Sequence, residues 1–231
     1  MSKKCLIRQS AGLGDILLCQ KIGYHYQDLG YEIIWPVEPV YSYVKDYLKN
    51  FKYILTTDDY EFTDEMITLQ LHGSVKKVGG PYILDAKYKI SKVDIDDWTD
   101  YIHIERNKEK EDKLFYDILG LQDDEEYVLI NETFASPPHS QENKIVIKDD
   151  HRKQIKMNYI KDITLFDWLK VIENASQIDV VDSCITVLLN LIDLKTEAVT
   201  IYSRVNKPSI PSYKQTEHLF NSHGKWNYKQ L

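Results

Sequence analysis

The stretch Lys4–Leu29, KCLIRQSAGLGDILLCQKIGYHYQDL, decides the fold of this chain. Its first residues, Lys4–Gln9, form a short apolar run that predicts a β-strand. The two glycines of Ser10–Asp15 then predict a tight turn, and the apolar spacing after it predicts a helix that ends before Gly30. A strand, a glycine turn and a helix in this order are typical of a parallel α/β sheet.

The same alternation continues through the first half of the chain. A helix is expected over Tyr41–Lys49, and further strands are expected at Tyr31–Val37, Lys52–Thr56 and Ile67–Leu71. A charged helix over Lys108–Leu119 ends at Gly120, and the acidic segment Gln122–Glu126 follows it. Because few contacts need to cross so polar a segment, we expect two domains, 1–122 and 123–231.

The second half repeats this plan. Thr164 and Asp167 have the spacing of a capping box and predict a helix start. Helices are expected over 165–175 and 184–192, and strands at Tyr127–Asn131, Lys144–Lys148, Ile178–Asp182 and Ala198–Ser203. The tail after Pro208 has no regular pattern and is expected to be irregular. The chain is therefore expected to be an α/β protein with one parallel sheet in each half.

Composition excludes several classes of function. The 231 residues carry a formal net charge of −7, and a chain that binds duplex DNA or an anionic membrane needs a positive surface, so nucleic acid is an improbable partner. Cys5, Cys19 and Cys184 form no C-x-x-C pair, as expected for thiols in a reducing compartment. No apolar run approaches the roughly 18 residues of a membrane span, and we expect a cytoplasmic protein without one.

Three turns offer groups for chemistry, each at the end of a predicted strand. Gly12 and Gly14 let a ligand approach the backbone, and Asp15 places a carboxylate at the first helical residues, where it is either a functional group or only a helix cap. Asp182 and Ser183 stand at a second strand-to-helix turn, again as ligand groups or as caps.

The third turn follows the strand Tyr127–Asn131. Thr133 and Ser136 lie in it and have hydroxyls that suit phosphate oxygens, although Ser and Thr in loops are more often solvated turn residues. In doubly wound sheets, ligands gather at the carboxyl ends of the strands, which is where these turns are expected to lie.

Two of these segments carry a resemblance. SAGLGDILL at Ser10–Leu18, together with DSCITVL at Asp182–Leu188, resembles the two signatures of the heptosyltransferase-like glycosyltransferases of the GT-B fold. The second signature of that family has Gly and His where this chain has Cys184 and Val187, and the chain is shorter than such enzymes. The resemblance implies two shortened Rossmann-like domains with a cleft between them.

The resemblance also implies a reaction, the transfer of a sugar from a nucleotide-activated donor to an acceptor hydroxyl. Asp15 matches the proposed catalytic base, and the transfer is expected to be inverting and metal-independent. The leaving diphosphate would be held by residues with hydroxyl, backbone or guanidinium donors. These are Gly12, Gly14, Thr133, Asp182, Ser183 and Arg204, with Lys207 as an alternative to Arg204.

The acceptor is assigned to the segment 82–106, which mixes aromatic and charged side chains as sugar sites do. Its candidates are Lys87, Tyr88 and Trp98, and Arg8 is added because it stands just before the first turn. A helical hairpin with buried aromatics is the alternative, and the more probable one for Trp98. Asp94 and Asp96 also form a D-x-D motif, which is one way to bind a metal ion. The alternative is that Asp96 marks the start of a helix.

His218 and His223 lie in the irregular tail without a metal-ligand pattern. No cofactor is therefore expected beyond the nucleotide sugar, which is a substrate, and the acceptor is expected to be a glycan or another hydroxyl compound. A non-catalytic nucleotide- or glycan-binding module on the same fold is the alternative function.

Overall fold

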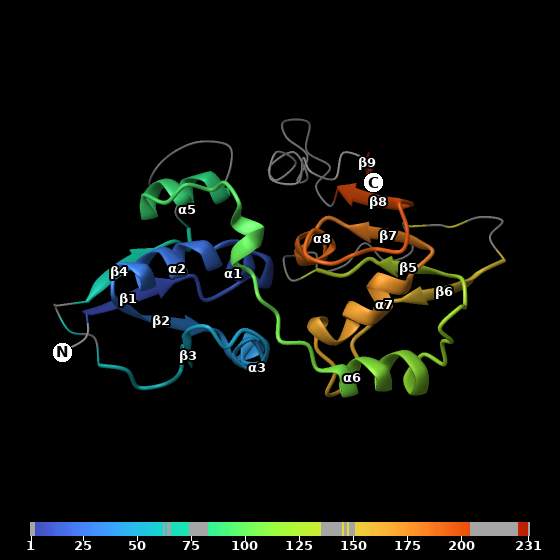
Figure 1. Ribbon diagram of the computed structural model, residues 1–231, viewed down its shortest axis with the longest axis horizontal. Helices are drawn as coiled ribbons and strands as arrows, with labels where there is room; N and C mark the ends of the chain where they lie inside the picture. The colour runs from blue at the N-terminus through green and yellow to red at the C-terminus, as the bar shows by residue number, and fades with distance from the viewer. Residues whose placement is uncertain are drawn as a thin grey trace. The chain divides into compact units, whose positions relative to one another are not determined.

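The chain forms two compact units, Met1–Glu105 and Arg106–Leu231, and each contains a parallel β-sheet (Figure 1). The computed structural model describes residues 3–61, 63, 66–73, 83–134, 145, 147, 151–203 and 226–230. The units divide at 105/106, earlier than the predicted boundary at 122/123. The reason is that Leu114 and Phe115, from the predicted helix before that boundary, pack into the core of the second unit.

The first unit has a four-stranded sheet of order β3-β2-β1-β4, and all its neighbouring strands run parallel. Its strands are β1 (Lys3–Arg8), β2 (Tyr31–Val37), β3 (Lys52–Leu55) and β4 (Ile67–Gln70). The middle of β1 is fully buried at Cys5, Leu6 and Ile7, as expected for a strand that is covered on both faces.

Short helices accompany this sheet, and Figure 1 shows α3 beside β3 and α5 near β4. They are α1 (Leu13–Leu18), α2 (Gln20–Asp28), the 3-10 turn η1 (Pro39–Tyr41), α3 (Val44–Tyr47), α5 (Ile83–Ser91) and the 3-10 turn η2 (Trp98–Tyr101). The helix predicted up to Leu29 is thus two helices, interrupted at Cys19, whose φ and ψ of −97° and 5° leave the helical range.

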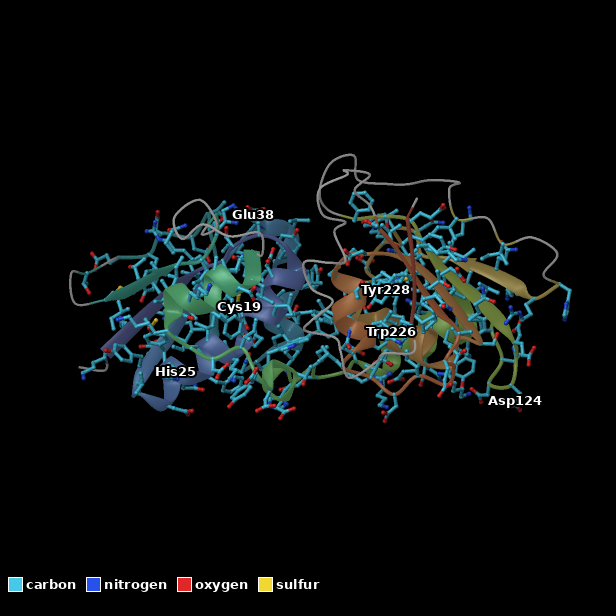
Figure 2. The ribbon with its side chains drawn as sticks, turned by 90° about the horizontal axis from the view of Figure 1, so that it is seen from above. Cys19, His25, Glu38, Asp124, Trp226 and Tyr228 are labelled. Atoms are coloured by element: carbon cyan, nitrogen blue, oxygen red, sulfur yellow. The ribbon has the colours of Figure 1, made fainter. Side chains whose placement is uncertain are left out.

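The second unit has a five-stranded parallel sheet of order β6-β5-β7-β8-β9. The strands are β5 (Tyr127–Asn131), β6 (Lys153–Lys156), β7 (Gln177–Val181), β8 (Val199–Ser203) and β9 (Asn227–Gln230). Trp226 and Tyr228, labelled in Figure 2, pack against the main core cluster of this unit.

Helical segments accompany this sheet, and Figure 1 shows α6 and α7 below β5 and β7 and α8 beside β7. They are α6 (Lys108–Asp112), the π-helical segment η3 (Lys113–Ile118), the 3-10 turn η4 (Leu165–Trp168), α7 (Leu169–Asn174) and α8 (Cys184–Leu189). The capping box predicted for Thr164 and Asp167 is confirmed, since the Thr164 amide donates to the Asp167 carboxylate over 2.7 Å.

Two predictions for the second unit need correction. Of the strand expected at Lys144–Lys148, the structure describes Ile145 and Ile147, and neither lies in a strand. The neighbour of β5 is instead β6, at Lys153–Lys156. The tail after Pro208 is not wholly irregular, because β9 pairs in parallel with β8.

The strand orders define where ligands are expected in each unit. In the first sheet the chain runs outward from β1 to β2 and β3 and then returns to place β4 on the other side of β1. In the second sheet, β6 and β7 lie on opposite sides of β5. Such reversals leave a crevice at the carboxyl ends of the central strands, so the turns after β1, β5 and β7 are where ligands are expected.

Candidate functional site

The turn after β1 is held by two hydrogen bonds, one from a side chain of β2 and one from the residue that follows β2. The indole of Trp35 donates to the Gln9 carbonyl over 2.9 Å, and the Glu38 amide donates to the Ser10 carbonyl over 3.0 Å. Gly12 precedes α1 with a φ of +79°, a left-handed conformation that L side chains rarely adopt. These contacts fix the loop between β1 and α1, and Asp15 lies in the first turn of α1.

Asp15 forms an ion pair with Lys87 of α5. Lys87 Nζ donates to Asp15 Oδ1 over 2.5 Å, and the two residues are 72 positions apart in the chain. The lysine side chain is 2% exposed, whereas the aspartate side chain is 41% exposed. The charge that water reaches at this site is therefore the carboxylate, while its counter-charge lies inside the protein.

The second carboxylate oxygen lies over Gly12. A Cβ atom added to Gly12 would stand 2.8 Å from Asp15 Oδ2, closer than real Cβ contacts allow. Within the described residues, Oδ2 has no hydrogen-bond partner. The predicted site residue Gly12 thus makes room for the carboxylate, and Gly14, also predicted, is the half-buried second residue of α1.

The predicted acceptor residues are placed unequally. Lys87 contacts Asp15 from a buried position. Tyr88 is 2% exposed and its hydroxyl donates to the Leu18 carbonyl over 2.7 Å, while Trp98 is 4% exposed. Both side chains are therefore part of the packed interior, which is the alternative given above for Trp98. In this structure neither ring has a face exposed to a sugar. Arg8 ends β1 and is exposed.

In the second unit, Thr133 follows β5 and is exposed. Its hydroxyl donates to Asn131 Oδ1 over 3.0 Å, and the Asn131 amide donates back to the Thr133 carbonyl over 3.0 Å. This pair closes the turn locally. A ligand at Thr133 would therefore have to share or replace the bond to Asn131.

The turn after β7 is arranged as a helix cap. Ser183 precedes α8 and its hydroxyl accepts from the Ile185 amide, while Thr186 reaches back to the Ser183 amide. Thr186 also donates over 3.4 Å to Asp182, which is 7% exposed. The capping alternative describes what these groups do in the structure, and their role toward a donor stays a prediction.

A cation that the sequence analysis did not select lies beside this edge. Lys156, at the carboxyl end of β6, places its Nζ 3.5 Å from Oε2 of Glu132, and Glu132 also accepts from the Ile145 amide. The lysine is 45% exposed and the glutamate 7%. If β6 had been predicted at its true position, Lys156 would have been expected at the ligand edge. Neighbouring parallel strands have their carboxyl ends at the same edge of a sheet.

The D-x-D pair lies in an exposed turn before η2. Asp94 Oδ1 accepts from the Asp96 amide over 3.1 Å, and the Asp96 carbonyl accepts from Lys21. The residue directly before η2 is Asp97, not Asp96, and it has a left-handed φ of 54°. In the part of the chain that the structure describes, no group of three His, Cys, Asp or Glu side chains gathers as a metal site would require.

Several predicted positions lie outside the described residues, namely Arg204, Ser136, Lys207, His218 and His223. No helix among the described residues is long and apolar enough to cross a membrane. Cys5 and Cys19 are free thiols, and burial raises the pKa of each to about 12. Cys19, labelled in Figure 2, lies inside the first unit.

The comparisons with known proteins are structural. No protein-family model and no curated protein sequence matches the chain. Its fold is similar to the crystal structure of a family 9 glycosyl transferase from Veillonella parvula, with a TM-score of 0.60 at 12% identity over 99% of this chain and 86% of that one. At such identity the likeness shows the fold, which is the fold of family 9 glycosyltransferases.

A second similar structure is TibC from enterotoxigenic E. coli, described as an iron-containing dodecameric glycosyltransferase. The TM-score is 0.56 at 11% identity, over 87% of this chain and 58% of TibC. The chain thus spans little more than half of TibC. Iron and the dodecamer are features of TibC, and what carries over is the parallel α/β architecture.

Proposed function

We propose that this protein is a glycosyltransferase that moves a sugar from a nucleotide-activated donor to an acceptor hydroxyl, with Asp15 as the catalytic base. The observation that carries the proposal is the Asp15 carboxylate itself, exposed in the first turn of α1 and paired with a buried ammonium. The fold shared with family 9 glycosyltransferases supports the same function. Asp15 follows β1, at the edge of the first sheet where ligands are expected.

The chemistry follows from the charge of Asp15. As the acceptor oxygen attacks the anomeric carbon of the donor, its proton passes to the Asp15 carboxylate. The bond between the anomeric carbon and the diphosphate oxygen breaks, and its electron pair leaves with the nucleoside diphosphate. Attack opposite the leaving group inverts the anomeric centre. A carboxylate that contacts Lys87 through Oδ1 and leaves Oδ2 without a hydrogen bond among the described residues suits the first of these events.

The second unit would hold the leaving diphosphate. Thr133, Asp182 and Ser183 follow the two strands that flank the reversal of its sheet, and Arg204 comes directly after β8. Hydroxyl donors and a guanidinium are suitable partners for a diphosphate. We include Lys156 among the candidate cations because it lies at the same edge.

A thermal-shift screen with nucleoside diphosphates and nucleotide sugars tests the donor. A donor present at about 100 times its dissociation constant should stabilise the chain by about 2.7 kcal/mol. The same screen with chelator added tests metal independence, since a metal-dependent donor site would lose the shift. A panel in which no compound raises the melting temperature would contradict the proposal.

One observation favours the alternative, a non-catalytic module that binds a nucleotide or glycan. The polar groups of Asp182, Ser183 and Thr186 bond one another, which leaves fewer of them for a donor. Such a module would bind a nucleotide without turnover. Release of nucleoside diphosphate in the presence of mixed hydroxyl acceptors separates the two functions.

A further inference from the structure

We infer that Lys87 is a positioning residue for the proposed transfer, on which this inference rests. Its ammonium holds Oδ1 of the ionised Asp15 carboxylate and leaves Oδ2 as the oxygen that receives the acceptor proton. In the part of the chain that the structure describes, Asp15 is the one partner of this ammonium.

Burial makes a lysine costly at this place. Lys87 is 2% exposed, and lysine is almost never fully buried unless it is paired. The pairing offsets only part of the desolvation cost, because Asp15 is 41% exposed and water screens its charge. A methionine would fill a similar volume without a buried charge. Packing therefore does not explain why position 87 is a lysine.

The two carboxylate oxygens of Asp15 have different surroundings. Oδ1 accepts from Lys87 over 2.5 Å. Oδ2 lies over Gly12 and, among the described residues, accepts no hydrogen bond. A base needs a free oxygen with a fixed direction, because proton transfer requires the acceptor hydroxyl within hydrogen-bond reach. This division of the two oxygens provides that direction.

Lys87 does not hold α5 in place by itself. Tyr88 donates from α5 to the Leu18 carbonyl over 2.7 Å, and Tyr26 of α2 donates to the Ser91 carbonyl of α5 over 3.2 Å. Two hydrogen bonds thus attach α5 to α1 and α2 without any charge. Replacing Lys87 should therefore change the environment of Asp15 while α5 keeps its position.

The test compares Lys87→Met, Lys87→Arg and Tyr26→Phe with the wild-type chain. For Lys87→Met, we expect kcat to fall by about tenfold or more at pH 7, while KM for the donor stays within about threefold. Lys87→Arg keeps the charge and should restore most of the kcat. Tyr26→Phe removes an uncharged attachment of α5 and should lower only the melting temperature.

Wild-type kcat in Lys87→Met, or equal proportional changes in kcat and in the donor KM, would overturn the positioning role and leave the proposed transfer intact. A second readout does not need turnover. In protein labelled with ¹³C-aspartate, the Asp15 carboxyl signal at pH 7, assigned by its absence in Asp15→Asn, should move in Lys87→Met. An unmoved signal would also overturn the inference.

Failure of the proposed function looks different. A wild-type chain that binds no nucleotide sugar and releases no nucleoside diphosphate would overturn the transfer and, with it, the catalytic purpose of Lys87. The movement of the Asp15 carboxyl signal would then show only that the ion pair exists. The binding screen is therefore run first, on the full chain.

Discussion

The Lys87 ammonium lies 2.5 Å from the Asp15 carboxylate, and the cation of this pair is buried while the anion is exposed. The two residues therefore depend on each other unequally. Without Lys87, the carboxylate still has water as a partner. Without Asp15, the ammonium is a buried charge with no counter-charge, which is strongly unfavourable.

This asymmetry predicts the stability of three variants. Asp15→Ala should lower the free energy of unfolding by about 2 kcal/mol, because it leaves the Lys87 charge unpaired. Lys87→Met should cost less than that, and the double variant should recover most of the loss caused by Asp15→Ala. Urea unfolding of the three chains measures the cycle. Simple addition of the two single effects would contradict the ion pair.

Gly12→Ala should impair the site as well as the fold. The backbone at Gly12 has a φ of +79°, and the new methyl group would meet Asp15 Oδ2 at 2.8 Å. We expect a loss of about 1 kcal/mol in unfolding free energy and a fall in turnover, because the carboxylate must move. Gly30→Ala is the control, since Gly30 has a φ of +84° but no atom within 4 Å of its added Cβ. Full turnover in Gly12→Ala would contradict the assigned place of Asp15.

Two variants of Ser183 distinguish a role in helix capping from a role in donor binding. Ser183→Ala should cost about 1 kcal/mol because the hydroxyl accepts from the Ile185 amide, and Ser183→Gly should cost only a few tenths. If the hydroxyl also binds the diphosphate, both variants lose donor affinity to a similar degree. Calorimetric titration with the donor found in the screen measures this. Unchanged affinity in both variants would make Ser183 a cap alone.

The buried thiols predict a loss of stability in alkaline solution. Burial raises the pKa of Cys5 and Cys19 to about 12, whereas an unfolded thiol ionises near pH 9. Above pH 9 the unfolded chain therefore releases protons that the folded chain keeps, so the unfolding free energy falls as pH rises. The stabilisation is complete below pH 9 and is lost progressively toward pH 12.

Each thiol should contribute a slope of up to about 1.4 kcal/mol per pH unit above pH 9. Urea unfolding under reducing conditions at pH 8.0 and 9.8 measures it before most tyrosines ionise. The variant with both Cys5→Ala and Cys19→Ala should show a smaller fall over the same interval. An equal fall in both chains would mean that these thiols do not cause it.

Local patterns in the sequence were sufficient for much of the fold. The strands Tyr31–Val37 and Tyr127–Asn131 have the predicted bounds, because continuous apolar runs suit strands buried on both faces. The cap at Thr164 was readable for a similar reason, since a capping box has a fixed spacing of three residues.

The pairing of strands that lie far apart in the chain could not be predicted from local patterns. Lys144–Lys148 is more apolar than Lys153–Lys156, yet the latter pairs with β5. The polar strand Asn227–Gln230 has no period that marks it, and its place beside β8 depends on the whole sheet.

In the candidate site, too, local features could be predicted from the sequence and long-range contacts could not. The position of Asp15 after a glycine turn followed from local spacing. Its contact with Lys87 joins residues 72 positions apart, and no local pattern predicts such a pair. A lysine in an amphipathic segment is usually solvated, so the sequence pointed to an exposed acceptor contact, whereas the structure buries Lys87 behind the carboxylate.

The most direct test of the account measures nucleoside diphosphate release by wild type and Asp15→Asn with the same donor and acceptor mixture. We expect turnover to fall by a factor of about 100 or more in the variant, while the dissociation constant of the donor stays within about threefold. Asparagine keeps the size of the side chain and a hydrogen-bond acceptor for Lys87. Equal turnover in the two chains would show that Asp15 is not the base.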